Sequence, residues 1–157
     1  MRIAVLSDTH GNAWALEACV HAAGHVDAWF FLGDNTRDTA ALEATGAAVY
    51  AVRGNTDLGA AYPVERVVEL GGKRIFLCHG HTYGVNGGLT RLALRARELG
   101  CQAALFGHTH IPFLDETGPV VLLNPGSPTR PRGGSKRCMG LLRIAEEALD
   151  AELMPLP

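Results

Sequence analysis

The sequence contains only four cysteines, and their spacing suits neither a disulfide framework nor a thiolate metal site. Cys19, Cys78, Cys101 and Cys138 lie far apart, and none belongs to a CxxC motif. This pattern excludes a zinc site built from thiolates and a small secreted scaffold stapled by disulfides. Because cysteine behaves as a small hydrophobic residue in protein cores, we expect all four to be buried.

An excess of charge and long hydrophobic runs are also absent. Fourteen basic and 16 acidic residues give a net charge of −2, and the basic residues form no long block. Strong electrostatic binding to nucleic acid or to an anionic membrane is therefore not expected. Met1 leads directly into Ile3–Leu6 without a signal peptide, and no apolar run has membrane-spanning length, so we expect a cytoplasmic protein. A length of 157 residues with 47% hydrophobic residues predicts one domain, residues 1–157, and leaves a homo-oligomer open.

What the sequence does contain is a series of short apolar runs that each end in polar residues. Such runs are typical of buried strands, and parallel strands of one sheet system bring their carboxyl ends to a common crevice. We therefore expect the polar clusters to converge. The six runs are 3–6, 28–32, 49–52, 74–78, 103–106 and 120–123, and each is followed by Asp, Asn, His, Gly or Ser.

Other patterns predict the remaining elements. Helical spacing of apolar residues predicts a helix over 13–23, capped by Asn12 and ended by Gly24, and a second helix over 89–99. Gly71-Gly72 predicts a two-residue hairpin turn. Further predictions are a short helix at 38–45, strands at 67–70, 139–144 and 150–154, and a mobile loop at 128–136, which is rich in Pro, Gly, Arg and Ser.

Five of the seven histidines fall in the polar clusters at the strand ends. In a β-like segment, His108 and His110 would point to the same side. Imidazoles, carboxylates and an amide without thiolates suit Mn, Fe, Co, Ni or Zn better than Ca or Mg. The candidate ligands exceed what one metal ion needs, so two ions sharing a carboxylate would use the set fully. The set comprises Asp8, His10, Asp34, Asn55, Asp57, His79, His81, His108 and His110.

These residues form motifs that resemble, in order, those of the calcineurin-like metallophosphoesterases. The motifs are Asp8-Thr9-His10, Gly33-Asp34, Gly54-Asn55-Thr56-Asp57, His79-Gly80-His81 and Gly107-His108-Thr109-His110. The short length and the Asn124-Pro125-Gly126-Ser127 segment look most like the small prokaryotic phosphodiesterase subfamily, which also resembles the retromer subunit Vps29. The resemblance implies an α+β fold, a four-layer α/β/β/α sandwich with the metal site at the carboxyl ends of the strands.

The resemblance also implies an activity and a ligand set. It implies a metal-dependent phosphoesterase, preferentially a phosphodiesterase, acting on a small phosphoester through a hydroxide that bridges two divalent ions. Manganese is the first choice of metal, with Ni, Fe, Co and Zn as alternatives. By the resemblance, Asp8, His10 and His110 would bind one ion, Asn55, His79 and His108 would bind the other, and Asp34 would bridge both.

One position departs from the family pattern. Many members carry a histidine after the motif asparagine, where this chain has Thr56, and a threonine hydroxyl is not a useful acid at neutral pH. His81 or a water then protonates the leaving group, or the substrates have good leaving groups. Asp57 would orient a ligand or simply form the turn. The candidate catalytic residues are therefore Asn55, Asp57 and His81. Thr56 and Arg130 are candidate substrate-binding residues.

Two other functions are compatible with paired histidines or with this fold. A retromer-like binding scaffold would keep the fold without the activity. Loss of the ligand histidines would favour this interpretation, and none of them is missing. A metal-dependent amidohydrolase also uses paired histidines, but its barrel typically needs about 250 residues. His21 and His25 lie four residues apart near a helix end, where a histidine is favoured by the helix dipole alone, so we interpret them as structural.

Overall fold

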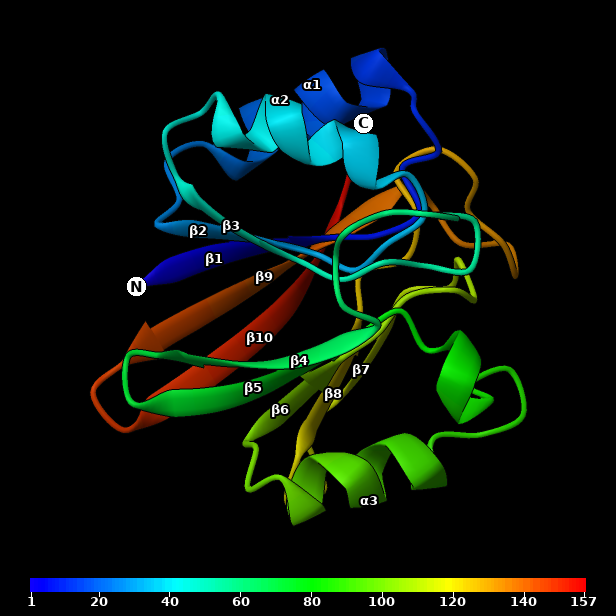
Figure 1. Cartoon of the computed structure of the whole chain (residues 1–157). Helices are drawn as coiled ribbons and strands as arrows, with labels where there is room; N and C mark the ends of the chain where they lie inside the picture. Colours follow the sequence, from blue (N-terminus) through cyan, green and yellow to red (C-terminus); the bar gives the residue numbers. More distant parts are fainter.

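The chain folds into two β-sheets packed face to face with helices on both outer surfaces (Figure 1). The computed structural model describes residues 1–157. The first sheet has the order β10-β9-β1-β2-β3, and the second has the order β4-β5-β6-β8-β7. Helices α1 and α2 cover the outer face of the first sheet, and α3 covers the outer face of the second (Figure 1). This is the α/β/β/α sandwich predicted above.

The strands of the first sheet are β1 (Arg2–Leu6), β2 (Ala28–Phe31), β3 (Ala48–Ala51), β9 (Cys138–Ala145) and β10 (Ala148–Pro155). The second sheet contains β4 (Glu65–Leu70), β5 (Lys73–Cys78), β6 (Ala103–Leu105), β7 (Phe113–Asp115) and β8 (Val121–Asn124). Strands β1, β2 and β3 run parallel, as do β5, β6 and β8. Each sheet therefore brings three carboxyl ends to one edge.

The helices are α1 (Ala13–Ala23), α2 (Thr39–Glu43) and α3 (Thr90–Glu98), with 3-10 turns η1 (Thr36–Asp38) and η2 (His81–Tyr83). The Asn12 side chain accepts a hydrogen bond from the Ala15 N–H at 3.0 Å, which confirms the predicted cap of α1. The helix expected at 38–45 is instead a 3-10 turn followed by the shorter α2. No helix is long and apolar enough to cross a membrane.

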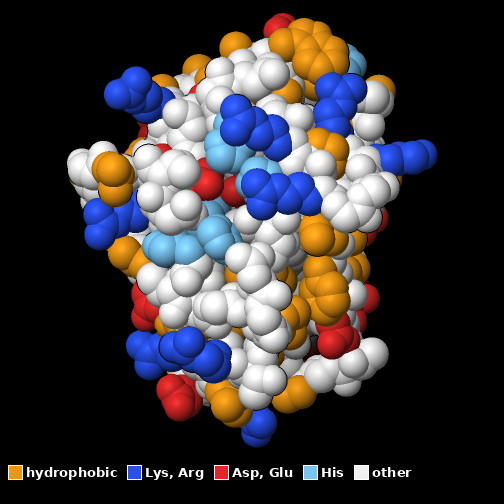
Figure 2. Space-filling model, turned by 90° about the vertical axis from the view of Figure 1, so that its right-hand side faces the viewer, with side chains coloured by type: hydrophobic (Ala, Val, Ile, Leu, Met, Phe, Trp, Pro, Cys, Tyr) orange, Lys and Arg blue, Asp and Glu red, His pale blue; other side chains and the backbone are white.

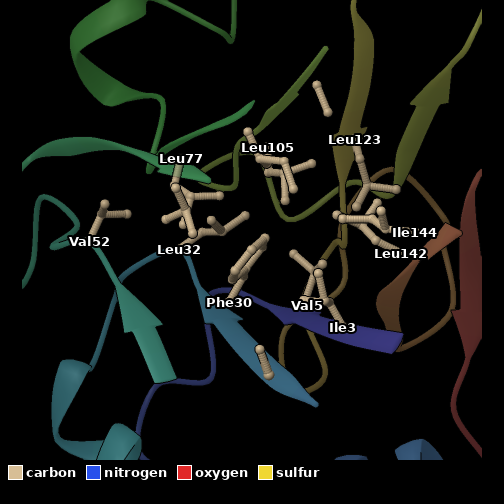
Figure 3. Close-up of a cluster of buried hydrophobic side chains, with 14 residues drawn as sticks. Ile3, Val5, Phe30, Leu32, Val52, Leu77, Leu105, Leu123, Leu142 and Ile144 are labelled. Carbon is tan, nitrogen blue, oxygen red and sulfur yellow. The ribbon is translucent and has the colours of Figure 1, made fainter. Parts of the chain in front are cut away.

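Strict alternation of side chains explains why three layers of core form. Ile3 and Val5 of β1 point into the core between the sheets, whereas Ala4 and Leu6 point toward α1. In the second sheet, Leu77 faces the first sheet and Phe76 faces α3. Figure 3 shows side chains from both sheets meeting in the central core. A strand buried on both faces needs a continuous apolar run, which is what the sequence pattern provides.

Most predicted elements occur within two residues of their expected bounds. Gly71 and Gly72 have φ values of 56° and 76°, which the predicted hairpin turn between β4 and β5 requires. All four cysteines are buried free thiols, as predicted. The strand β7 was not predicted, because its three residues show no periodicity. It lies at the edge of the second sheet and pairs only with β8.

Candidate metal centre

The polar clusters at the strand ends do converge at one edge of the two sheets. Ligand atoms of Asp8, His10, Asp34 and His110 all lie within 4.8 Å of one another. Asp8 and His10 follow β1, Asp34 follows β2, and His110 follows β6. Figure 2 shows imidazole and carboxylate side chains gathered on one face of the molecule. Residues 102 positions apart in the chain thus form one group of oxygen and nitrogen donors.

A second group of donors adjoins the first. The Nε2 atom of His79 lies 3.5 Å from Asp34 Oδ1 and 3.8 Å from Asp8 Oδ1. The His108 ring lies 5.1 Å from the His79 ring, centroid to centroid, and His108 Nδ1 lies 3.0 Å from Asn55 Oδ1. Asp34 therefore stands between a group that contains His10 and His110 and a group that contains His79 and His108.

Hydrogen bonds on the far side of two imidazoles fix which nitrogen faces the centre. His79 Nδ1 donates to the Leu32 carbonyl at 2.7 Å, and His110 Nδ1 donates to the Arg130 carbonyl at 2.8 Å. In each ring the Nε2 atom is then left to face the carboxylates of the centre. A histidine that binds a metal typically has this arrangement, with the other ring nitrogen bonded to a carbonyl.

Two buried polar atoms in the centre have no hydrogen-bond partner. They are Asp8 Oδ1 and His79 Nε2, and both side chains are completely buried. His110 Nε2 lies 3.1 Å from Asp8 Oδ1 but without hydrogen-bond geometry. An unpartnered carboxylate oxygen and imidazole nitrogen are costly to bury, and divalent cations bound at the centre would satisfy both atoms. The donor set therefore fits a metal centre.

The backbone of the centre adopts a conformation that side chains rarely allow. Left-handed φ values between 50° and 87° occur at seven non-glycine residues, and six of these lie in the strand-end loops. Such strain tends to concentrate at functional sites, where the surrounding structure holds it in place. The six residues are Asp8, His10, Asp34, Asn35, His108 and His110.

Two glycines allow the loops to pack directly against the carboxylates. A Cβ atom on Gly54 would lie 2.1 Å from Asp34 Oδ1, and a Cβ atom on Gly107 would lie 2.0 Å from Ser7 Oγ and 2.8 Å from Asp8 Oδ2. Any larger residue would displace these groups. Gly54 and Gly107 of these motifs thus allow the backbone to lie close to Asp34 and Asp8.

The carboxylate of Asp57 binds the backbone of the loop that carries Asp34. It accepts hydrogen bonds of 2.8 Å from the N–H groups of Asp34, Asn35, Thr36 and Gly54. Burial opposes its ionisation, but these four donors outweigh burial and lower the pKa of the Asp57 carboxyl. Asp57 therefore ties the β2 loop to the β3 loop.

The direction of the pKa shift differs among the residues of the centre. Burial opposes ionisation of Asp8, yet the neighbouring His110 and His79 and the Ser7 hydroxyl lower the pKa of the Asp8 carboxyl. Burial lowers the pKa of His10, His81 and His108. The pKa of His110 is raised, chiefly because the Asp8 carboxylate stabilises its protonated form.

The remaining predicted residues lie around the centre. The Thr56 N–H donates to Asp34 Oδ1 at 3.1 Å, and the His81 ring lies 5.5 Å from the His79 ring and 6.2 Å from the His108 ring. The Nδ1 atom of His81 is buried without a hydrogen-bond partner. Arg130 is exposed, and its charge acts on His10. His21 and His25 are exposed near the end of α1 and do not belong to the cluster of ligand atoms.

Three hydroxyl groups that the sequence pattern did not identify hold Asp8 in place. Ser7 Oγ donates to Asp8 Oδ2 at 2.7 Å, and the hydroxyls of Ser127 and Thr129 donate to the Asp8 carbonyl at 2.8 and 3.1 Å. Asn124 donates to the Gly107 carbonyl at 3.0 Å. The position of Asn124 and Ser127 directly after the sixth apolar run was the signal available in the sequence.

Comparisons with known proteins agree with this geometry. A calcineurin-like phosphoesterase superfamily domain matches residues 1–147. A probable metallophosphoesterase of Methanothermobacter thermautotrophicus is 40% identical over 160 residues, which cover 98% of this chain and 92% of the relative. A conserved protein of Streptococcus pneumoniae, described as a predicted phosphoesterase, superposes with a TM-score of 0.84 at 32% identity, covering 98% of this chain and 88% of that one.

Vps29 of Entamoeba histolytica in complex with Zn²⁺ shares the fold. It superposes with a TM-score of 0.79 at 23% identity, and the match covers 99% of both chains. At this identity the likeness shows the architecture alone. The family match, in contrast, spans nearly the whole sequence and contains every residue of the centre. The chain belongs to the calcineurin-like phosphoesterase superfamily.

Proposed function

We propose that this protein is a metal-dependent phosphoesterase, preferentially a phosphodiesterase, that hydrolyses small phosphoesters. The observation that carries the proposal is the pair of buried, unpartnered donors, Asp8 Oδ1 and His79 Nε2, inside a cluster of carboxylates and imidazoles. The preference for diesters rests on the resemblance of the motifs to the small prokaryotic phosphodiesterases. The four unpaired thiols fit the reducing cytoplasm as its location.

The ligands divide into two sets that share one carboxylate. Asp8, His10 and His110 would hold one ion, and Asn55, His79 and His108 would hold the other, with Asp34 common to both. The short distances within each set and the position of Asp34 between them support this division. Mixed oxygen and nitrogen donors suit Mn²⁺, which we propose first, and also Ni, Fe, Co or Zn.

Two such ions would activate a water molecule as the nucleophile and would offset the charge that develops on the phosphoryl oxygens. The protein itself orients the donors. Asp57 fixes the loop of Asp34 through four N–H groups, and Ser7, Ser127 and Thr129 fix Asp8. With the donors held in this way, no side chain of the protein needs to act as a nucleophile.

His81 is our candidate for the proton donor to the leaving group. It adjoins His79 and His108, and its Nδ1 atom has no partner within the chain. Burial lowers its pKa, so its protonated form is populated mainly below neutral pH. We therefore expect His81→Gln to slow hydrolysis of alkyl esters, which need an acid, much more than hydrolysis of p-nitrophenyl esters. Equal slowing of both substrate types would assign another role to His81.

Thr56 and Arg130 are our candidates for contacts with the substrate. Both are exposed beside the centre, and basic side chains flank the imidazoles in Figure 2. The charge of Arg130 acts on His10, and the charge of Arg132 acts on His110, so an anion at the centre would be attracted by both arginines. Arg130→Gln should raise KM for a phosphodiester with a smaller change in kcat.

The direct test is hydrolysis of bis(p-nitrophenyl) phosphate by the purified protein with added Mn²⁺. Asp34→Asn and His108→Ala should abolish activity, whereas His21→Ala, an exposed histidine outside the centre, should retain it. An inactive wild-type protein across Mn, Co, Ni and Zn, with both monoesters and diesters, would refute the proposed function.

A retromer-like scaffold is the alternative, and it makes a different prediction. Such a protein would be purified together with a stable partner and would hydrolyse no phosphoester, because its fold would serve binding alone. Assays of phosphoester hydrolysis, combined with affinity purification of partners and measurement of metal content, separate the two functions. The complete set of oriented donors favours the enzyme.

A further inference from the structure

A small apolar hollow is lined in part by the segment that carries the last histidine motif. Its volume is about 230 Å³. One wall is the segment that carries the last motif, with Phe106, Thr109 and Ile111, continued by Phe113 at the start of β7. The other wall is the segment between η2 and α3, with Val85, Asn86 and Leu89. Five of these seven residues are hydrophobic.

The hollow and the metal centre share their backbone. Phe106 and Ile111 bracket the motif 107–110, so the chain that presents His108 and His110 to the metals also lines the hollow. On the other wall, Val85 follows closely after His79 and His81, and a Cβ atom on Gly80 would lie 2.9 Å from Val85. An apolar patch lies on the same face of the molecule as the imidazoles (Figure 2). A group bound at the centre could therefore extend into the hollow.

The hydrophobic groups of the hollow are partly open to solvent. Phe106 and Val85 are almost fully buried and form its floor, whereas Ile111 and Phe113 are 43% and 38% exposed at its rim. Leaving such apolar surface in water carries a free-energy cost that a bound apolar group would remove. The Asn86 side chain is exposed, and its amide makes no hydrogen bond within the chain, so it offers a polar contact at the same rim.

We propose that this hollow binds a planar aromatic substituent, such as a nucleobase, of the phosphoester whose phosphate lies at the metal centre. This inference deepens the proposed function and depends on it for the position of the phosphate. A cavity of about 150 Å³ is enough for benzene, so the volume here admits one aromatic ring system. Phe106 and Phe113, with ring centroids 6.4 Å apart, provide aromatic contacts, and Asn86 can pair with a ring heteroatom.

The test compares two ligands that differ only by the base. Uridine 5′-monophosphate and ribose 5-phosphate carry the same sugar phosphate, and their dissociation constants from the Mn²⁺-loaded protein can be measured by calorimetry while phosphate release is followed. Stacking of one base is worth about 1–3 kcal/mol, so we expect the nucleotide to bind about tenfold more tightly. Equal affinity for the two ligands would overturn the inference.

Variants show whether the preference comes from the hollow. Phe113→Ala removes part of the rim and Leu89→Asn makes one wall polar, so each should reduce the preference for the nucleotide to about twofold or less, with ribose 5-phosphate bound as before. Leu94→Ala, which changes an exposed leucine of α3 outside the hollow, should keep the full preference. A full preference in both hollow variants would overturn the inference.

Hydrolysis of bis(p-nitrophenyl) phosphate tests the proposed function separately. A protein that prefers the nucleotide but hydrolyses no phosphoester would keep the hollow as a binding site and refute the enzyme. An active enzyme without preference for the nucleotide would refute the hollow alone.

Discussion

Single residues decide which atoms of the centre are free to bind a metal. The His79 and His110 rings each donate Nδ1–H to a main-chain carbonyl, and this leaves Nε2 toward the carboxylates. Asp8 uses Oδ2 to accept from Ser7 and from the His108 N–H, and this leaves Oδ1 unpartnered. Each of these three side chains is thus oriented by a hydrogen bond at its other polar atom, which would reduce the reorganisation that metal binding requires.

The raised pKa of His110 predicts that metal binding releases protons. The Asp8 carboxylate raises this pKa, so in the metal-free protein His110 carries a proton at higher pH than an ordinary histidine, and the metal must displace that proton. The pKa values of His10 and His108 are lowered, so we expect these two residues to bind the metal near pH 7 without losing a proton. We expect the apparent affinity for Mn²⁺ to rise with pH through the pKa of His110 and then to level off.

Calorimetry of Mn²⁺ binding in buffers of different ionisation enthalpy measures this proton release. The observed enthalpy should depend on the buffer near pH 6.5–7 and become nearly independent of it at higher pH. A binding enthalpy that is the same in all buffers near neutral pH would show that His110 is already neutral in the metal-free protein.

Substitution of Asp57 should lower both the free energy of unfolding and the affinity for the metal. Asp57→Asn replaces a carboxylate oxygen by an amide that cannot accept from an N–H group, so buried donors of the Asp34 loop lose their partner. Hydrogen bonds to charged groups contribute about 1.5–3 kcal/mol, and we expect a loss of unfolding free energy of about that size. Weaker Mn²⁺ binding should accompany it, because Asp34 is no longer held in place.

The pH dependence of this loss follows from the lowered pKa of Asp57. Because the folded-state pKa lies below the unfolded value, the stabilisation is fully present above the unfolded value of about 3.9 and is lost as the pH falls through the folded value. Denaturant unfolding of wild type and variant should therefore differ by a constant amount at neutral pH and converge in acid. Asp150→Asn, at an exposed position, is the control. A variant with wild-type stability at pH 7 would show that Asp57 is dispensable.

The sequence identified the residues that converge at the centre better than the residues that support them. Histidines and aspartates directly after apolar runs are conspicuous, because metal chemistry restricts the residue types that can serve. Ser127 and Thr129, in contrast, contribute hydroxyls to the carbonyl of Asp8, more than a hundred residues away in the chain. Serine and threonine are common in loops for many reasons, so only the folded structure shows which of them act on the centre.

At the level of elements, the loops after the strands determine the geometry of the centre. The β2 and β3 loops approach so closely that only glycine fits at position 54, which has an ordinary backbone conformation. The requirement at Gly54 is therefore steric and not conformational. An alanine at this position thus tests the close approach of the two loops without straining the backbone.

Gly54→Ala should impair metal binding without unfolding the sheets. The new Cβ atom would lie 2.1 Å from Asp34 Oδ1 and 2.6 Å from the Asp34 nitrogen, so Asp34 must shift. We expect Mn²⁺ affinity to fall at least tenfold, as measured by calorimetry, with the far-ultraviolet circular dichroism unchanged. Gly118→Ala is the matched control, since its only contact within 4 Å would be at 3.9 Å. Unchanged Mn²⁺ binding in Gly54→Ala would show that the loop yields at little cost.

The elements themselves were largely predictable because burial on both faces leaves a clear pattern. Ile3–Leu6 and Ala28–Leu32 are continuous apolar runs, and each forms a central strand of the first sheet. β7 was missed because Phe113–Asp115 gains its structure from pairing with β8 rather than from its own pattern. The order of the strands within each sheet likewise depends on long-range packing that no local pattern records.

For the whole molecule, the metal centre lies where the two sheets meet. Asp8, His10 and Asp34 come from loops of the first sheet, and His79, His108 and His110 come from loops of the second. The central core already joins the sheets through side chains of both, from Ile3 and Phe30 to Leu77 and Leu105 (Figure 3). A metal ion at the centre would add a second connection at their shared edge.

Metal binding should therefore stabilise the molecule as one unit. A ligand that binds only the folded state at a hundred times its Kd adds about 2.7 kcal/mol, and each kcal/mol raises Tm by about 2–4 °C for a chain of this size. We expect Mn²⁺ to raise Tm by roughly 5–10 °C in a single calorimetric transition, and excess chelator to reverse the shift. Asp34→Asn should show little shift, because it removes the carboxylate shared by both ligand sets. Two separate transitions, of which Mn²⁺ moves only one, would show instead that the ions bind within one sheet and leave the other independent.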